Sequence, residues 1–262
     1  MDEKNVVQIG GSIEKSLQGQ YSIDVPSVLK EAWQLTLRSR ISINLGLLFT
    51  LVLGIVVSFL ISNTMGGIEE VIVDQQAMTL LNIAVTMIIY PFLVGVEMMG
   101  IFHAVGLKTN SKLIFSFLRR GSWVAVCALL TSIFVTLGMQ LYLLPGIYLA
   151  VALSLALPLV VEKKLSPIKA ILISIQTTRF QWFKLFTIYT LLMVALFLSL
   201  LPLAILAKTQ LSIVGIMFFL FALTFIAPLF YNVKGILYRE IFGMQIRAVD
   251  AKPLPVNDSF SA

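Results

Sequence analysis

Three charged residues lie in or beside apolar segments of the chain, each six positions after a proline. Six helical residues span about 9 Å, so these charges would lie at a similar depth on three spanning helices. A lone charge in the hydrocarbon layer is costly, whereas a paired one near its edge costs much less. The spacing predicts that Glu97 pairs with Lys234 or Lys164 and locks the cytoplasmic ends of the bundle, the alternative being that Glu97 reaches headgroup water unpaired. The three combinations are Pro91 with Glu97, Pro158 with Lys164, and Pro228 with Lys234.

The residue types that usually carry catalysis or bind metals are scarce. The chain has one histidine, His103, and one cysteine, Cys127, so a metal site would need an acidic cluster that the sequence lacks. No H-E-x-x-H, G-x-S-x-G or Walker A pattern is present, and no nucleophile–base pair supports an intramembrane hydrolase. We interpret His103 as an interfacial side chain bonded to backbone or headgroup, with a proton carrier as the alternative, and Cys127 as a buried spectator thiol. We expect a protein that is not an enzyme and has no cofactor.

Basic side chains gather at one edge of the apolar segments. Each could gain about 1 kcal/mol near anionic lipid. Such charges also set the orientation of any membrane protein, so topology alone is the alternative explanation. Because the charge follows the membrane boundary, nucleic-acid binding is not expected despite a net charge of +6. The candidate anionic-lipid contacts are Lys112, Arg119, Arg120, Lys163, Lys169, Arg179 and Lys184.

The composition indicates a protein built for a bilayer. Hydrophobic residues make up 58% of the chain and charged residues 12%, against about 25% charged residues in soluble domains. Long apolar runs predict spanning helices, and the short alternating segments of a membrane β-barrel are absent. We therefore predict an all-α polytopic protein with six transmembrane helices. The predicted spans are residues 41–61, 77–106, 121–143, the run from a Pro145-Gly146 turn to Glu162, 182–206 and 211–231.

Amphipathic segments accompany these spans, and we predict that they lie in the membrane interface as helices. Three of them begin at Ser27, Ser111 and Ser166, and a fourth continues the last span over 232–247. The chain thus contains three units, each with an amphipathic helix, a span, an outside turn and a span that contains proline. The alternative is that hydrophobic helices resemble one another by chance.

Each proline in a spanning helix has a further consequence for the backbone. Proline frees the carbonyl four residues earlier, which here means Met87, Ser154 and Thr224. A freed carbonyl needs a donor from a neighbour or from water, so the three prolines are expected at helix contacts and not facing lipid.

The distribution of basic residues predicts the orientation. If both termini are cytoplasmic, every Lys and Arg except Lys208 lies on the cytoplasmic side, as the positive-inside rule requires. Residues 62–76 contain no Lys or Arg and form an outside loop. The predicted organisation is a disordered cytoplasmic tail over 1–24, a six-span membrane domain over 25–247 and a cytoplasmic polar tail over 248–262.

One stretch carries a resemblance to known proteins. The pattern PGIYL…ALPLVVEKKLSPIKAILIS…RFQWFKLF runs from Pro145 to Phe186 and contains a Pro-Gly turn, Pro158 before Glu162, and a serine-started helix. It resembles bacterial six-span inner-membrane proteins of the YciC type and the membrane domain attached to some glycerophosphoryl diester phosphodiesterases. The resemblance implies a six-span architecture in the bacterial cytoplasmic membrane. It transfers no catalytic residue and no phosphodiesterase activity.

Two functions are open at this point. The first is a non-enzymatic inner-membrane protein that supports envelope organisation or lipid homeostasis, with the bilayer and its anionic phospholipids as partners. The second is a transporter or permease component for a lipid-like or small amphipathic solute, because proline-broken helices and repeats are typical of transport sites. Few charged residues lie inside the spans, which leaves coupling ions without obvious ligands.

Overall fold

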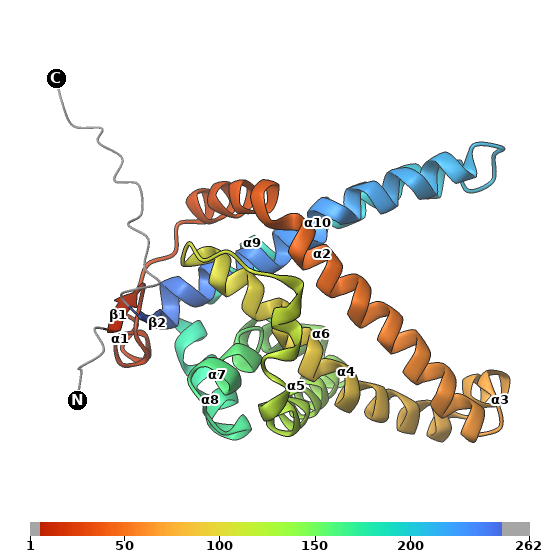
Figure 1. Cartoon of the computed structure of the whole chain (residues 1–262), viewed down its shortest axis with the longest axis horizontal. Coiled ribbons are helices and arrows are strands. Elements are labelled where there is room, and N and C mark those ends of the chain that lie inside the picture. The colour runs from red at the N-terminus through yellow and green to blue at the C-terminus, as the bar shows by residue number, and fades with distance from the viewer. Residues whose placement is uncertain (1–5, 248–262) are drawn as a thin grey trace.

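The computed structural model describes residues 6–247 and is all-α apart from one two-stranded sheet (Figure 1). Within these residues, six helical segments are long and apolar enough to cross a membrane, which confirms the predicted six-span α-helical architecture. The strands are β1 (Val6–Ile9) and β2 (Met244–Arg247). The α-helices are α1 (Ile13–Leu17), α2 (Val25–Thr64), α3 (Ile68–Val73), α4 (Gln75–Ala104), α5 (Gly121–Leu141), α6 (Leu143–Ala152), α7 (Ala156–Glu162), α8 (Pro167–Thr178), α9 (Trp182–Leu206) and α10 (Ser212–Phe242).

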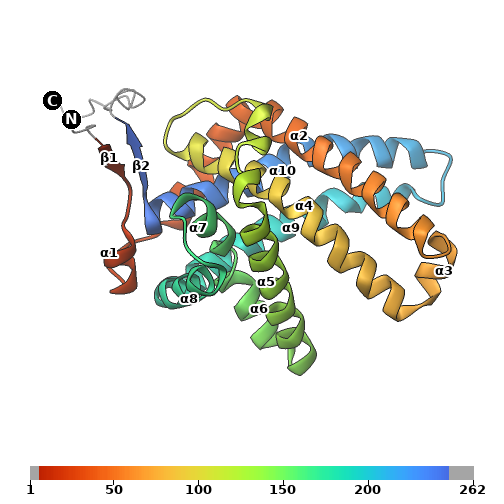
Figure 2. The ribbon, with the colours of Figure 1, turned by 60° about the horizontal axis from the view of Figure 1, so that its bottom comes forward.

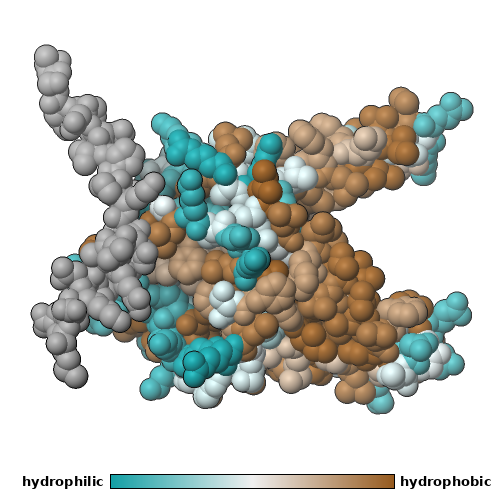
Figure 3. All heavy atoms as spheres, viewed as in Figure 1, coloured by the Kyte–Doolittle hydropathy of each residue, from teal (hydrophilic) through white to brown (hydrophobic). Residues whose placement is uncertain are grey.

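Three helical hairpins diverge from a common base (Figures 1 and 2). They are α2 with α4, α5 with α6, and α9 with α10, and the base is the end of the bundle that carries the sheet, α7 and α8. Of the most apolar window in α10, only 11% is buried, against 61% for the segment from α6 to α7. The hairpins therefore need a surrounding apolar phase, while α7 forms the enclosed centre. Figure 3 shows apolar surface on the hairpins and hydrophilic surface at the tips and base.

The hairpins agree with the predicted repeating unit in one further respect. Two second arms contain a buried proline, Pro91 in α4 and Pro228 in α10, and the third buried proline, Pro158, lies in α7, which follows α6. The amphipathic segments are less uniform than predicted. The first is continuous with the first span as the 40-residue α2, which starts where Asp24 accepts a hydrogen bond from Ser27 N at 3.1 Å. The second consists of two 3₁₀ turns, Ser111–Phe115 and Leu118–Arg120, and only α8 is a separate α-helix.

The turn before the fourth span lies three residues earlier than predicted. Tyr142 has an extended backbone (φ −159°, ψ 150°) and separates α5 from α6, whereas Pro145 and Gly146 lie in the first turn of α6. Proline fits there because the first N–H groups of a helix need no intrahelical partner. Gly146 allows α5 and α6 to pack closely, because a Cβ on Gly138 of α5 would lie 2.9 Å from the Gly146 Cα.

The prediction of a disordered segment over 1–24 is wrong for residues 6–24. Strand β1 pairs antiparallel with β2, with Val7 opposite Ile246, and joins the two ends of the described chain. The same pairing corrects the last predicted helix, because α10 ends at Phe242 and residues 244–247 form β2. The predicted polar tail over 248–262 lies outside the described residues.

The N-terminal segment caps the base through specific backbone contacts. Gly11 N donates to the Arg239 carbonyl at 2.9 Å, and the same carbonyl accepts from Gly243 N at 3.0 Å where α10 ends. A Cβ at Gly11 would overlap the Ile241 carbonyl, so the approach requires glycine. The Tyr21 hydroxyl donates to the Thr177 carbonyl of α8 at 2.6 Å, which ties this segment to a second helix.

Candidate functional site

The crossing of α4 and α10 brings two charged residues together. Gly100 of α4 and Gly235 of α10 meet so closely that a Cβ at either position would overlap backbone of the other helix. This contact places Glu97 and Lys234, three residues and one residue away along their helices, beside each other. Lys234 Nζ lies 2.6 Å from Glu97 Oε1. Of the two partners that the sequence leaves open for Glu97, Lys234 and Lys164, the structure places Lys234 beside it.

The ion pair is buried in the bundle. The Glu97 and Lys234 side chains are 7% and 9% exposed, so Glu97 does not reach headgroup water. The second carboxylate oxygen, Oε2, is buried without a hydrogen-bond partner among the described residues. The alternative partner, Lys164, is exposed and has no ion pair with Glu97 in the described part of the chain. The reason is that α7 ends at Glu162, so the sixth residue after Pro158 has already left the helix.

A second buried cluster lies near the ion pair in sequence and joins α2, α4, α10 and the loop after α4. His103 Nδ1 is 3.2 Å from Asn232 Oδ1, and His103 Nε2 is 2.6 Å from the Thr109 hydroxyl. Asn232 Nδ2 donates to Thr36 at 3.0 Å and lies 3.4 Å from the Ser39 hydroxyl. His103 is thus a buried residue bonded to side chains of α10 and of the loop after α4. The predicted bonding to backbone or headgroup is wrong, because both ring nitrogens contact side chains and helix contacts enclose this position.

The hydrogen bonds of Asn232 assign the histidine tautomer. The amide nitrogen of Asn232, Nδ2, donates to the Thr36 hydroxyl. The amide oxygen, Oδ1, can only accept, so it accepts a hydrogen bond from His103. Nδ1 of His103 therefore carries the proton, and Nε2 accepts from the Thr109 hydroxyl. With both ring nitrogens bonded, the geometry fits a structural histidine joining α4 to α10.

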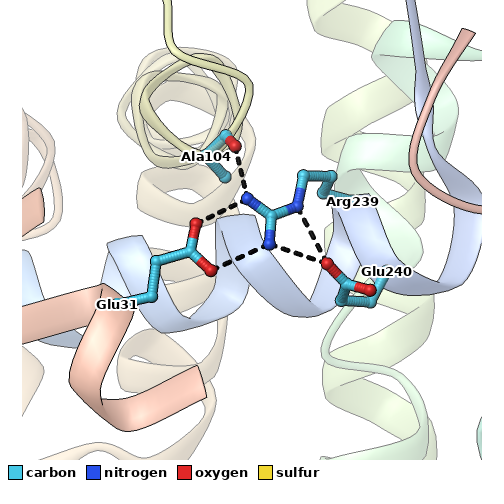
Figure 4. Close-up of polar contacts among 4 residues, drawn as sticks. All are labelled: Glu31, Ala104, Arg239 and Glu240. Carbon is cyan, nitrogen blue, oxygen red and sulfur yellow. Dashed lines mark hydrogen bonds and ion pairs between the residues drawn. The ribbon is translucent and has the colours of Figure 1, made fainter. Parts of the chain in front are cut away.

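A charged cluster at the base joins α2, α4 and α10 (Figure 4). Arg239 donates to both carboxylate oxygens of Glu31, at 2.5 and 2.9 Å, and to the Ala104 carbonyl at the end of α4, at 2.6 Å. Its Nε and Nη2 also contact Glu240 Oε1, at 3.0 and 2.7 Å. Because a planar guanidinium holds carboxylates in two-pronged geometry, Arg239 fixes the ends of three helices. Arg239 was not predicted from the sequence to have this role.

One of the three carbonyls that proline leaves without a helical hydrogen bond accepts a hydrogen bond from a neighbouring side chain. Asn44 Nδ2 donates to the Thr224 carbonyl at 2.9 Å, four residues before Pro228, as the proline argument requires of a neighbour. Asn44 was not identified from the sequence, although a lone amide side chain in an apolar run was the available signal. It lies at a groove of about 1000 Å³ with almost entirely apolar walls from α2, α4 and α10.

The predicted lipid contacts fall into two sets. Two are engaged in the fold: Arg120 donates to the Val160 carbonyl at 2.8 Å, and Lys163 pairs with Glu162 at 3.1 Å. The others are exposed around the base: Lys112, Arg119, Lys169, Arg179 and Lys184.

A hollow of about 570 Å³ lies between the 3₁₀ turns and the end of α7. Its walls include Arg119, Arg120 and Lys164, together with Trp123 of α5, and no acidic side chain of residues 6–247 lines it. An unbalanced group of three cations in a hollow of this size is suited to an anion such as a phosphate. Lys164 was predicted as a partner of Glu97, and the structure instead places it here.

Among residues 6–247, no group of three His, Cys, Asp or Glu side chains could hold a metal ion. Comparisons with known protein families, with characterised proteins and with solved structures found no match to this chain. The fold therefore defines the class: a multi-pass α-helical membrane protein of three diverging hairpins joined by buried polar contacts at one end.

Proposed function

We propose that the chain is a non-enzymatic integral protein of the bacterial cytoplasmic membrane, with both termini cytoplasmic, that supports envelope or lipid homeostasis by binding anionic phospholipids. The orientation follows from the basic residues, of which Lys208 alone is assigned to the outer side. The resemblance of residues 145–186 to YciC-type proteins supports the bacterial location.

The observation that carries this proposal is the surface of the base, where exposed cations alternate with exposed apolar side chains. Lys169 lies between Ile168 and Leu172 on α8, and Lys184 follows Phe183 at the start of α9. Apolar side chains that enter the acyl region beside cations that reach phosphate are typical of anionic-lipid interfaces. Several elements share this composition, so the whole base contributes to the lipid contact.

The proposal is tested by native mass spectrometry of the full-length protein after reconstitution in mixed phosphatidylglycerol and phosphatidylcholine. We expect several phosphatidylglycerol molecules to remain bound after release from the bilayer, in excess over their fraction in the mixture. In cells, deletion is expected to change phospholipid composition or envelope integrity. Lipid retention in proportion to the mixture, together with an unchanged envelope on deletion, contradicts the proposal.

The second candidate, a transporter or permease component, is favoured by one observation: the 1000 Å³ groove that opens between α2, α4 and α10. A lipid-like solute could enter it sideways from the bilayer. Solute flux measured in proteoliposomes distinguishes the two functions. The variant Gly54→Phe projects a ring into the groove and tests whether the solute passes through it. Transport requires flux above that of empty vesicles and a loss of that flux in the variant.

A further inference from the structure

Two hollows on the surface of the base meet at one tryptophan. The first is the cationic hollow of about 570 Å³, and the second is a crevice of about 330 Å³ between α5 and α8. Trp123 lines both. The first wall is cationic and the second is apolar, so Trp123 stands at the boundary between them, a position that its amphipathic indole favours.

The positive charge of the cationic hollow is not neutralised by acidic side chains of residues 6–247. Arg119 and Lys164 form no ion pair within residues 6–247, and Arg120 is directed towards the Val160 carbonyl. The 21-residue α5 starts directly after Arg120 and adds the positive end of its dipole. An anionic group is the ligand that this arrangement recognises.

The conformation of Lys164 is a second and independent feature of the hollow. It has φ 55°, and it is the only non-glycine residue with positive φ in the described part of the chain. It directly follows the residue that caps α7, where glycine is usual because a side chain is strained in the left-handed region. Glycine would end α7 equally well, so the lysine side chain does not serve the helix end. Its ammonium group instead adds positive charge to the wall of the hollow.

The apolar crevice decides which anion fits. Trp123, Val126 and Leu130 follow one another at helical spacing on α5 and face Pro167 and Ile168 of α8. The crevice therefore leads from the cationic hollow along α5 into the span. A free phosphate would use only the hollow, whereas a phospholipid would fill both parts with its head at the base.

The geometry points to a two-part binding site for one anionic phospholipid, with its phosphate held by Arg119 and Lys164 and one acyl chain laid along α5 past Trp123. This inference rests on the proposed function and deepens it, because it selects one site from the general lipid contact of the base.

The test measures phosphatidylglycerol binding to the full-length protein in nanodiscs of increasing anionic fraction, read by native mass spectrometry. Lys164→Gly removes one wall charge and relieves the left-handed strain, so we expect at least threefold weaker binding with an equal or higher melting temperature. Lys108→Gln removes the same charge from an exposed position outside the hollow and outside the predicted lipid contacts, and it is expected to change binding by less than a factor of 1.5. Arg119→Gln is expected to resemble Lys164→Gly, and it decides the matter if the glycine variant is destabilised.

The part of the site that binds the acyl chain is tested by its own variant and matched control. Val126→Trp fills the crevice, and Val56→Trp makes the same change at an equally exposed position of α2, both valines being 47% exposed. We expect Val126→Trp alone to weaken phosphatidylglycerol binding, and neither inorganic phosphate nor glycerol phosphate to displace the lipid at millimolar concentration.

The outcomes separate this site from the proposed function. If Lys108→Gln weakens binding as much as Lys164→Gly, the contact is diffuse and the site is wrong, although the proposed function stands. If soluble phosphates displace the lipid, or if Val126→Trp binds normally, the acyl-chain part is wrong. If the unaltered protein shows no preference for phosphatidylglycerol, lipid binding by the base fails as a whole.

Discussion

Lys234 Nζ lies 2.6 Å from Glu97 Oε1 inside the bundle, beside the point where Gly235 touches the backbone at Gly100. Neither side chain has an alternative route to water, because both are less than one-tenth exposed. The close crossing of α4 and α10 and the pairing of their charges therefore depend on each other.

Removing either partner of this pair should destabilise the protein. Glu97→Lys places two ammonium groups together in a buried position, and loss of a buried partner costs about 3–5 kcal/mol. We expect a clear fall in the melting temperature measured by intrinsic fluorescence in mild detergent. The charge swap that combines Glu97→Lys with Lys234→Glu should recover part of the loss. If neither single variant nor the swap shifts the melting temperature, the pair does not hold the helices together.

Replacement of glycine at the crossing should be harmful although alanine is the better helix former. Gly235→Ala would drive a methyl group into the Gly100 carbonyl, and overpacking of this kind costs roughly 1–3 kcal/mol. Gly54→Ala is the matched control, because its nearest neighbour, the Ile89 side chain, is 3.9 Å away. That control should be neutral or stabilising by up to about 1 kcal/mol. Equal melting temperatures for the two variants would contradict the close crossing.

Helix α8 should respond differently on its two faces. Ile171 is 4% exposed, so Ile171→Asn is expected to lose roughly 1.5–3 kcal/mol of burial and to lower the melting temperature. Ile168→Asn and Leu172→Asn change exposed side chains and should mainly weaken contact with vesicles in a flotation assay. Gln176→Ala is expected to be mild. Thr177→Ala should be more harmful, because this side chain is buried and donates to the Ile173 carbonyl at 2.7 Å.

The N-terminal segment should be held less tightly when Tyr21 loses its hydroxyl group. Tyr21→Phe removes the 2.6 Å bond to the Thr177 carbonyl, which is worth about 0.5–1.5 kcal/mol. Hydrogen–deuterium exchange over residues 6–24 is expected to become faster. Exchange that is unchanged there would show that the segment is held without this bond, by its strand pairing and by the hydrogen bond from Ile23 N to Gln181 Oε1 at 2.9 Å.

The same tyrosine should give the segment a dependence on high pH. Burial raises the pKa of Tyr21 from 10.0 to about 12. Its bond therefore contributes fully below the unfolded pKa of 10 and is lost as pH rises through about 12. The Tyr21→Phe variant should lack this loss, so exchange measured between pH 9 and pH 11 should rise less steeply with pH than in the unaltered protein, once the intrinsic base-catalysed rate is divided out.

Orientation can be measured directly with reporter fusions. Fusions within residues 62–67, at Leu144 and at Lys208 should report the outer side of the membrane. Fusions at Thr109 and Lys164 should report the cytoplasm, because the positive-inside rule places the basic loops there. A periplasmic signal at Lys164 would overturn the six-span topology.

Much of the architecture is contained in the sequence alone. Hydropathy predicts six spans because spanning helices need long apolar runs whatever their neighbours are, and residues 182–206 coincide with α9 at both ends. Proline chemistry predicts that the Thr224 carbonyl needs a donor, and the spacing together with the cost of a lone buried charge predicts a lysine partner for Glu97, either Lys234 or Lys164.

Only the tertiary structure decides which segments meet. The choice of Lys234 over Lys164 depends on where α7 ends, and the burial of His103 depends on Asn232, more than a hundred residues away. Local pattern cannot supply such distances, because they are set by helix crossings such as that of Gly100 with Gly235. For the same reason a terminal segment that looked disordered by composition is ordered: strand β1 finds its hydrogen-bond partners in β2, at the other end of the chain.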